Sequence, residues 1–261
     1  PEASALCAER MPEFTERPRI LFFDVGNIFV SDDPSGAHCY RRIYETVCER
    51  KPMSVSDFFA WRERHMRAGG DLWKFALECV GKGDLPALQK SVRAHIYGRW
   101  EEYSPEIPGM AEVVRRLATT YRLGLLANQP AQIEQVLRKR DIWDLFDVHA
   151  ISDVLGSMKP DRRIFDWALD RAGVEAPQAL MIGDRLDNDI RPAKALGMQT
   201  LWLRIPFDER GWTPETEFQK AYATSMKTIG PGTRRPTAPE NTPDHVACSP
   251  AELVEILAPA T

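Results

Sequence analysis

The most constraining feature of this sequence is the alternation of short apolar runs with longer amphipathic segments. Predicted strands cover residues 19–23, 122–127, 147–151, 179–183 and 199–203. Predicted helices between them cover residues 110–120, 131–140, 161–173 and 189–196. Strands that alternate with helices form parallel sheets that are covered on both faces. We therefore predict an α/β fold with a Rossmann-like, doubly wound parallel sheet.

A long helical block separates the first predicted strand from the other four. Helix-like stretches cover residues 40–50, 54–68, 71–80 and 85–102, with glycine and proline breaks between them. Ser54 is a suitable N-cap for the second stretch. Because the strands on both sides belong to one alternating pattern, we predict an α/β core made of residues 19–31 and 104–261. Residues 32–103 are then an inserted all-helical cap domain.

The two ends of the chain show weaker patterns. Residues 1–18 are polar and are predicted to be a lead-in segment. Residues 206–244 are predicted to be irregular, because their second half is rich in Pro and Gly. After them we predict an edge strand near residues 245–248 and a last helix, with Pro250 at its first position.

The composition limits the class of partner and the compartment. Lys and Arg number 34 and Asp and Glu number 38, so the net charge of -4 gives no footprint for nucleic acid or an anionic membrane. No apolar run is long enough to span a bilayer. The five cysteines are scattered without a C-x-x-C pair, and no charged-then-apolar leader is visible. We therefore expect reduced thiols and a cytoplasmic location, while the oligomeric state is left undetermined.

Polar side chains follow four of the predicted strands. These residues are Asp24, Asn128, Lys159 and the acids Asp184, Asp187 and Asp189 of the sequence GDRLDND. In doubly wound sheets, ligands bind beyond the carboxyl ends of the strands, so we expect these side chains to lie together. Clustered carboxylates need a cation, and oxygen ligands without His or Cys favour Mg²⁺.

These residue types suit the hydrolysis of a phosphate ester. Mg²⁺ beside Asp24 would allow this carboxylate and an anionic phosphate to approach each other. Lys159 would balance the remaining charge, while Asn128 and the backbone N–H groups of Val25 and Gly26 would hold phosphate oxygens. A carboxylate nucleophile divides hydrolysis into the formation of an aspartyl-phosphate and its breakdown by water.

The motifs FFDVGN, LLAN, GSMKPD and GDRLDND, followed by AKALGMQTLWL, resemble those of the haloacid dehalogenase (HAD) superfamily. More narrowly, the chain is similar to members whose helical cap is inserted just after the first strand. The motifs occur in the family's order and cover about residues 19–205. GSMKPD and GDRLDND are the most specific of them.

The resemblance implies a role for each matching residue. It implies that Asp24 is the nucleophile and that Lys159 holds both the nucleophile and the phosphate. It assigns the Mg²⁺ site to Asp24, the backbone carbonyl of Gly26, Asp184 and, in support of the metal or of nearby groups, Asp189. Asp187, which lies between the last two, is a weaker candidate and could equally be a solvated charge at a helix start.

Two positions depart from the family pattern. Gly26 stands where typical family phosphatases carry a second Asp as general acid and base, although some similar phosphatases have a D-x-G-N motif. Ala127 replaces a Ser or Thr whose hydroxyl would bind phosphate. General acid catalysis is typically worth ~10²–10⁴-fold. We therefore expect a slow enzyme or a substitute acid, for which His38, Asp32 and Asp33 are candidates by position.

Three functions remain open on the sequence alone. The favoured one is a phosphatase for a small phosphorylated metabolite. A dehalogenase-type hydrolase, in which Asp24 attacks carbon without a metal, is compatible with Gly26 but does not need the retained Asp184. A non-catalytic binding or regulatory protein would explain Gly26 and Ala127, but not the retained Asp24 and Asp184.

Overall fold

The computed structural model describes residues 14, 16–230, 233 and 235–258, and the chain divides into two compact units. The first, here the α/β unit, comprises Pro1–Val30, Glu106–Arg210 and Arg234–Thr261. The second, here the helical unit, comprises Ser31–Pro105 and Gly211–Thr233. The predicted lead-in at residues 1–18 lies largely outside the described residues.

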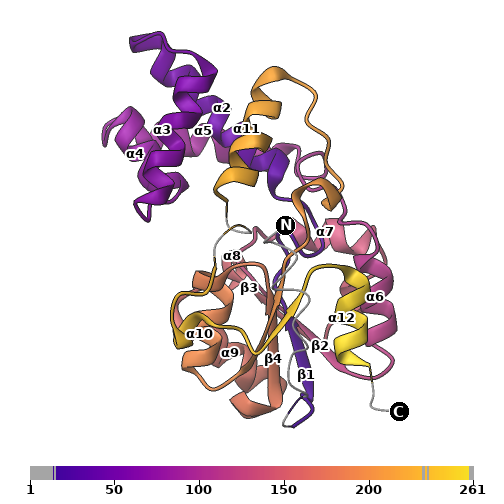
Figure 1. Ribbon diagram of the computed structural model, residues 1–261. Coiled ribbons are helices and arrows are strands. Elements are labelled where there is room, and N and C mark those ends of the chain that lie inside the picture. Colours follow the sequence, from indigo (N-terminus) through magenta and orange to yellow (C-terminus); the bar gives the residue numbers. More distant parts are fainter. Residues whose placement is uncertain (1–13, 15, 231–232, 234, 259–261) are drawn as a thin grey trace. The chain divides into compact units, whose positions relative to one another are not determined.

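The α/β unit is built on a parallel sheet of six strands (Figure 1). The strands are β1 (Ile20–Phe23), β2 (Arg122–Ala127), β3 (Val148–Ile151), β4 (Ala179–Gly183), β5 (Gln199–Leu203) and β6 (His245–Ala247). Their order is β3-β2-β1-β4-β5-β6, and every neighbouring pair is parallel. The Rossmann-like sheet is confirmed, and β6 lies at its edge as predicted. The strand order reverses between β1 and β4, where such folds place their ligands.

Helices cover both faces of this sheet (Figure 1). They are α6 (Met110–Leu117), α7 (Ile133–Arg138), α8 (Ser152–Leu155), α9 (Arg162–Ala172), α10 (Arg191–Ala195) and α12 (Pro250–Leu257). A π turn at Leu186–Ile190 precedes α10, so the helix predicted at 189–196 begins earlier and in a wider form. Helix α8 was not predicted, because four residues are too few to show a helical period.

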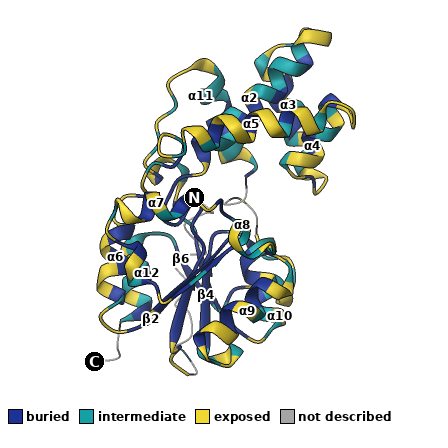
Figure 2. Ribbon diagram, turned by 180° about the vertical axis from the view of Figure 1, so that it is seen from behind, coloured by how far each residue is buried: buried dark blue, intermediate teal, exposed yellow. Residues whose placement is uncertain are grey.

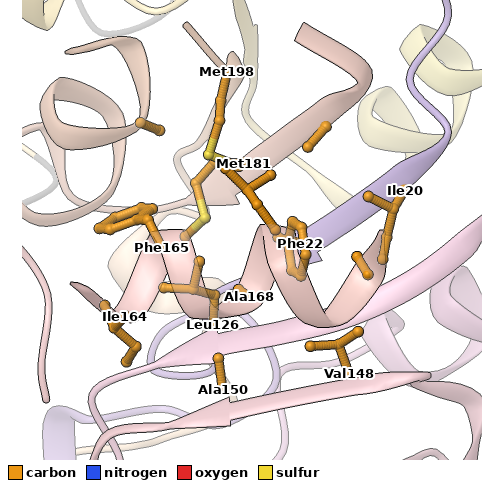
Figure 3. Packing of buried hydrophobic residues seen from close by; sticks show 14 residues of the cluster. Ile20, Phe22, Leu126, Val148, Ala150, Ile164, Phe165, Ala168, Met181 and Met198 are labelled. Carbon is orange, nitrogen blue, oxygen red and sulfur yellow. The ribbon is translucent and has the colours of Figure 1, made fainter. Parts of the chain in front are cut away.

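Apolar packing explains why β1 lies in the middle of the sheet. All four of its residues are fully buried, and alternate side chains point to opposite faces. Phe22 belongs to the same buried cluster as Leu126 and Met181 of the neighbouring strands and Phe165 of α9 (Figure 3). Its ring also lies over Gly124, where an added Cβ would come within 2.5 Å of a Phe22 ring carbon. Figure 2 shows that the strands of the sheet are buried, whereas the outer faces of the helices are exposed.

The helical unit contains the predicted helices and one that was not predicted. Its helices are α2 (Asp33–Arg50), α3 (Val55–Arg67), α4 (Leu72–Val80), α5 (Leu85–Gly98) and α11 (Glu217–Thr228). Helix α2 begins at Asp33 rather than near residue 40, and Ser54 caps α3 as predicted. The prediction that residues 206–244 are irregular is wrong for α11. A capping box between Thr216 and Gln219 starts this helix, but its few apolar residues hid it.

Aromatic rings and a buried arginine join α11 to the other helices of the helical unit. Phe218 of α11 lies 5.2 Å from the ring of Phe59, and Tyr222 lies 5.9 Å from the ring of Tyr40. Arg62 of α3 is only 2% exposed and donates to Ser225 Oγ at 2.9 Å and to the Ile229 carbonyl at 3.0 Å. Carbonyl groups at a helix C-terminus suit a buried guanidinium.

The structure bears on the state of the cysteines and on membrane-spanning helices. Cys39, Cys48 and Cys79 are free, whereas Cys248 is disulfide-bonded, so the expectation of reduced thiols is wrong for Cys248. Among the described residues, no helix is both long enough and apolar enough to span a membrane. The cytoplasmic location stays a prediction.

Candidate active site

Four buried charged side chains meet at the carboxyl edge of the sheet in the α/β unit. Lys159 Nζ lies 2.9 Å from Asp24 Oδ1 and 2.6 Å from Asp189 Oδ1. Carboxylate oxygens of Asp24, Asp184 and Asp189 lie within 4.8 Å of one another. None of the four residues is more than 8% exposed. The structure therefore brings together four of the residues that the sequence singled out, from β1, β4 and the loop after β3.

A tight turn after β1 positions Asp24. The Asp24 N–H donates to the Ile182 carbonyl of β4 at 2.9 Å, and the Phe29 N–H then folds back onto the Val25 carbonyl at 2.9 Å. Asn27 adopts a φ of 53°, a left-handed conformation that asparagine tolerates. Within the described residues, neither the Val25 nor the Gly26 N–H donates a hydrogen bond. Two backbone donors beside Asp24 are therefore available to an anion.

The π turn after β4 positions Asp189. Its Oδ1 accepts from Lys159, and its Oδ2 accepts from the Arg185 N–H at 2.9 Å. A Cβ on Gly183 would lie 2.3 Å from Asp189 Oδ2, so a glycine is needed for this close approach. Asp187 points elsewhere: it pairs with Arg185 at 2.9 Å, its side chain is 39% exposed, and it is not part of the cluster.

Asn128 holds the backbone of Lys159. Its Nδ2 donates to the Lys159 carbonyl at 2.8 Å, and its Oδ1 accepts from the Lys159 N–H at 2.7 Å. These two bonds use the carbonyl end of the amide and one of its two N–H groups. The structure thus gives Asn128 a positioning contact, and only one N–H is left for the predicted contact with phosphate.

The cluster carries more negative than positive charge. When its groups are ionised, three carboxylates face one ammonium, which leaves an excess of two negative charges. Burial, and next the Asp24 carboxylate, raises the pKa of Asp184 to about 6. Burial also raises the pKa of Asp189, against the effect of Lys159. Burial disfavours the Lys159 ammonium, but Asp189 and Asp24 outweigh it and raise its pKa.

This donor set fits a small divalent cation. All the side chains in the cluster that could ligate a metal are carboxylates, and hard oxygen ligands suit Mg²⁺. The excess of two negative charges also equals the charge of such an ion. Burial and next the Asp24 carboxylate disfavour the ionised form of Asp184, and a bound cation would favour it.

The profile of the haloacid dehalogenase-like hydrolase family matches residues 66–203, just over half of the chain of 261 residues. The chain belongs to this family. The match begins inside the helical unit and ends at the last residue of β5, so it includes Lys159, Asp184 and Asp189.

Named relatives of this HAD-like hydrolase match parts of it. Over 127 residues, 46% of the chain, it is 41% identical to a glyceraldehyde 3-phosphate phosphatase from Pyrococcus abyssi, of which it covers 53%. Over 111 residues, 42% of the chain, it is 32% identical to the pyrimidine 5'-nucleotidase YjjG from Escherichia coli, of which it covers 49%. The chain thus spans about half the length of these curated relatives.

The fold is also similar to solved structures. The HAD-hydrolase YfnB from Bacillus subtilis, whose structure is described as bound to magnesium, gives a TM-score of 0.63 at 20% sequence identity. The similarity covers 93% of this chain and 100% of that one. At this level of identity the comparison establishes the fold alone.

Sequence reasoning missed three residues that shape the site of this HAD-like hydrolase. Asn27 Nδ2 donates to Asp184 Oδ2 at 3.0 Å, and its place in the motif FFDVGN was a signal that could have found it. Gly183 is equally visible within GDRLDND. Trp202 Nε1 donates to the Asp184 carbonyl at 2.8 Å, a contact set by the pairing of Gly183 with Trp202 between β4 and β5. No sequence motif indicated that contact.

Two proposed substitute acids are engaged within the helical unit. Asp33 is buried, and its carboxylate accepts hydrogen bonds from Ser31 Oγ and from the Tyr222 hydroxyl, each at 3.2 Å. His38 Nδ1 lies 3.3 Å from the Tyr103 hydroxyl. These contacts give both side chains a structural role in their own unit.

Proposed function

We propose that this HAD-like hydrolase is a Mg²⁺-dependent phosphatase that acts on small phosphorylated metabolites through an aspartyl-phosphate on Asp24. The observation that carries the proposal is the buried cluster of three carboxylates around one lysine. Relatives named for phosphatase and 5'-nucleotidase activity support a phosphate ester as the substrate. Because the matched relatives differ in substrate, we propose the class of substrate and not one metabolite.

The proposed metal ligands are Asp24, the Gly26 carbonyl and Asp184. Asp184 Oδ2 already accepts from Asn27, so Oδ1 is the oxygen that we assign to the metal. Both oxygens of Asp189 accept hydrogen bonds, from Lys159 and from the Arg185 N–H, so we give it the supporting role of orienting Lys159. Bound there, Mg²⁺ would neutralise negative charge on the carboxylates and on the phosphate.

Asp24 Oδ1 bonds to Lys159 and has a second lone pair that would face the metal, so Oδ2 is left as the attacking oxygen. In the first step Oδ2 forms a bond to phosphorus while the bond between phosphorus and the leaving oxygen breaks. The leaving oxygen then takes up a proton. In the second step water attacks the same phosphorus, releases inorganic phosphate and restores the Asp24 carboxylate. Lys159 and the N–H groups of Val25 and Gly26 would bind the phosphate oxygens throughout.

The helical unit is assigned the role of a cap that admits substrate and then excludes water from the intermediate. Limited proteolysis of the wild-type protein tests this, in Mg²⁺ with and without a phosphate analogue such as tungstate. Cleavage of the helical unit is expected to slow when the analogue is present. Identical cleavage in both conditions would contradict the assignment.

The central experiment measures phosphate release from p-nitrophenyl phosphate and from a panel of alkyl phosphate monoesters, in Mg²⁺ and in EDTA. We expect Mg²⁺-dependent release that is lost in Asp24→Asn and retained in Asp187→Asn, a matched change at an acid outside the cluster. Because Gly26 cannot protonate a leaving group, the aryl ester, which leaves readily, should be favoured over the alkyl esters. Release that survives Asp24→Asn would refute the mechanism.

Gly26 also keeps a second candidate open, a dehalogenase-type hydrolase in which Asp24 attacks carbon. Displacement at carbon requires neither a second Asp nor a metal. Halide release from 2-haloacids, measured in EDTA in parallel with the phosphatase assay, separates the two reactions. A third candidate, a binding or regulatory protein without catalysis, is motivated by Gly26 and Ala127. Inactivity on both panels together with Mg²⁺ binding would favour it.

A further inference from the structure

A cleft in the helical unit gathers basic side chains that the proposed reaction does not use. It has a volume of about 510 Å³ and lies between α2 and the segment formed by α5 and the turn that follows it. This volume falls within the range of small-molecule sites. Helix α2 contributes His38, Arg41 and Arg42, and the opposite wall contributes His95 and Arg99. None of these residues belongs to the Asp24 cluster.

One histidine from each wall lines the cleft, and the two rings are in contact. The rings of His38 and His95 stack with their centroids 4.3 Å apart and an interplanar angle of 8°. The Tyr103 hydroxyl lies 3.0 Å from His95 Nε2 and 3.3 Å from His38 Nδ1. When this hydroxyl donates to Nδ1, His38 Nε2 carries the ring proton. Nε2 is buried without a hydrogen-bond partner, so it is a donor that lacks an acceptor.

His38 acts in this cleft as a neutral donor and not as a charge. Burial, followed by His95 and Arg42, lowers the pKa of His38 to about 4. The ring is therefore uncharged at neutral pH. A buried donor without an acceptor is unfavourable in free energy, and an oxygen of a bound ligand would relieve this.

Arginines supply the positive charge of the cleft. Arg41 and Arg42 both pair with one carboxylate, Glu45, and Arg99 pairs with Glu102, which lies outside the lining. Although burial raises the pKa of Glu45, its hydrogen bonds from Arg41 and Arg42 lower it overall, so it is ionised at neutral pH. Three guanidinium groups against two carboxylates leave an excess of one positive charge. Each guanidinium has five N–H donors, and many remain for a ligand.

We propose that this cleft binds the oxyanion group of a small molecule, a phosphate or a carboxylate, as a second anion site of the protein. The guanidinium groups of Arg42 and Arg99 provide charge-assisted hydrogen bonds, for which their forked geometry suits oxyanions. The ring N–H of His38 completes the donor set, while the Tyr103 hydroxyl donates to His38 Nδ1 and fixes this tautomer. The ligand is bound non-covalently, and the helical unit recognises it by the ligand's oxyanion group.

The test follows the side-chain resonances of His38 and His95 by NMR during titration of the wild-type protein with inorganic phosphate. EDTA is present throughout, so that the Asp24 cluster keeps its excess negative charge and repels the probe. We expect saturable shifts of both histidines with phosphate and none with chloride at equal ionic strength. An acetate titration shows whether a phosphate or a carboxylate binds more tightly, and saturable binding of either supports the proposal.

Variants identify the groups that hold the anion. Arg42→Gln and Arg99→Gln should each weaken binding by about tenfold or more, because each removes a charge-assisted hydrogen bond. Arg93→Gln, at an exposed arginine of α5 outside the lining, should leave the affinity unchanged. Unchanged thermal unfolding in the two cleft variants excludes loss of fold. No saturable shift in the wild type, or equal affinity in all three variants, would overturn the proposal.

Discussion

Replacing Asp184 with Asn should stabilise the protein in EDTA. It should also abolish the additional stability that Mg²⁺ gives to the wild type. At about pH 7.5 the wild-type carboxyl is ionised although it is buried beside Asp24. The rise of its pKa from 3.8 to about 6 corresponds to about 3 kcal/mol that the ionised group costs the folded state. The variant removes that charge, and its amide oxygen can still accept from Asn27.

Thermal unfolding of the α/β unit measures this effect. A gain of about 3 kcal/mol raises Tm by roughly 6–12 °C, since 1 kcal/mol shifts Tm by about 2–4 °C in a domain of this size. In excess Mg²⁺ the wild type should gain stability through binding, and the variant should gain little. Asp187→Asn, at the acid that pairs with Arg185 outside the cluster, is the matched control and should behave like the wild type under both conditions.

Two results would refute this reasoning. A Tm in EDTA below that of the wild type would mean that Asp184 stabilises the fold as an anion, in contradiction of its raised pKa. An undiminished gain from Mg²⁺ would mean that the ion binds without Asp184. Urea unfolding of the same variants provides an independent measure of the free energy difference.

The same electrostatics lead to three further expectations. The folded-state pKa of Asp184 lies above its unfolded value, so the stability that this carboxyl contributes in EDTA is complete below about pH 4 and is lost as pH rises to about 6. The difference in Tm between Asp184→Asn and the wild type should therefore fall to zero at about pH 4. Lys159→Met removes the only ammonium from the cluster and should destabilise the fold by about 3–5 kcal/mol in urea unfolding, and a smaller loss would show that the carboxylates tolerate its absence. Gly183→Ala places a methyl group 2.3 Å from Asp189 Oδ2 and should lower the rate of phosphate release at least tenfold. The control Gly98→Ala, with no atom within 4 Å of the added methyl group, should leave this rate unchanged. Equal rates in the two variants would mean that the position of Asp189 does not matter.

The alternation of apolar runs and helical segments was sufficient to predict the sheet. Strands β2, β4 and β5 have the predicted bounds, because buried parallel strands are short, apolar and bounded by polar residues. The convergence of Asp24, Lys159 and Asp184 could be predicted for the same reason, since every parallel strand ends at the same edge.

Contacts that depend on register or on distant loops could not be predicted. The bonds of Asn128 to the Lys159 backbone require the path of the loop after β3, and the bond of Trp202 to Asp184 requires the pairing of β4 with β5. The stacking of His38 on His95 joins two helices whose relative rotation no local pattern specifies. Each of these contacts arises from tertiary packing.

The helical unit draws its parts from two stretches of chain that are far apart in sequence. Arg62 and Ser225, which it joins, are separated by 163 positions, and the polypeptide passes between the two units four times. During synthesis, α2 to α5 emerge more than a hundred residues before α11. The rings of Tyr40 and Phe59 therefore lack their contacts with Tyr222 and Phe218 until most of the sheet has been made. The helical unit can therefore finish folding only after most of the α/β unit has been synthesised. A fragment that ends before α11 would leave these aromatic surfaces exposed and prone to aggregation.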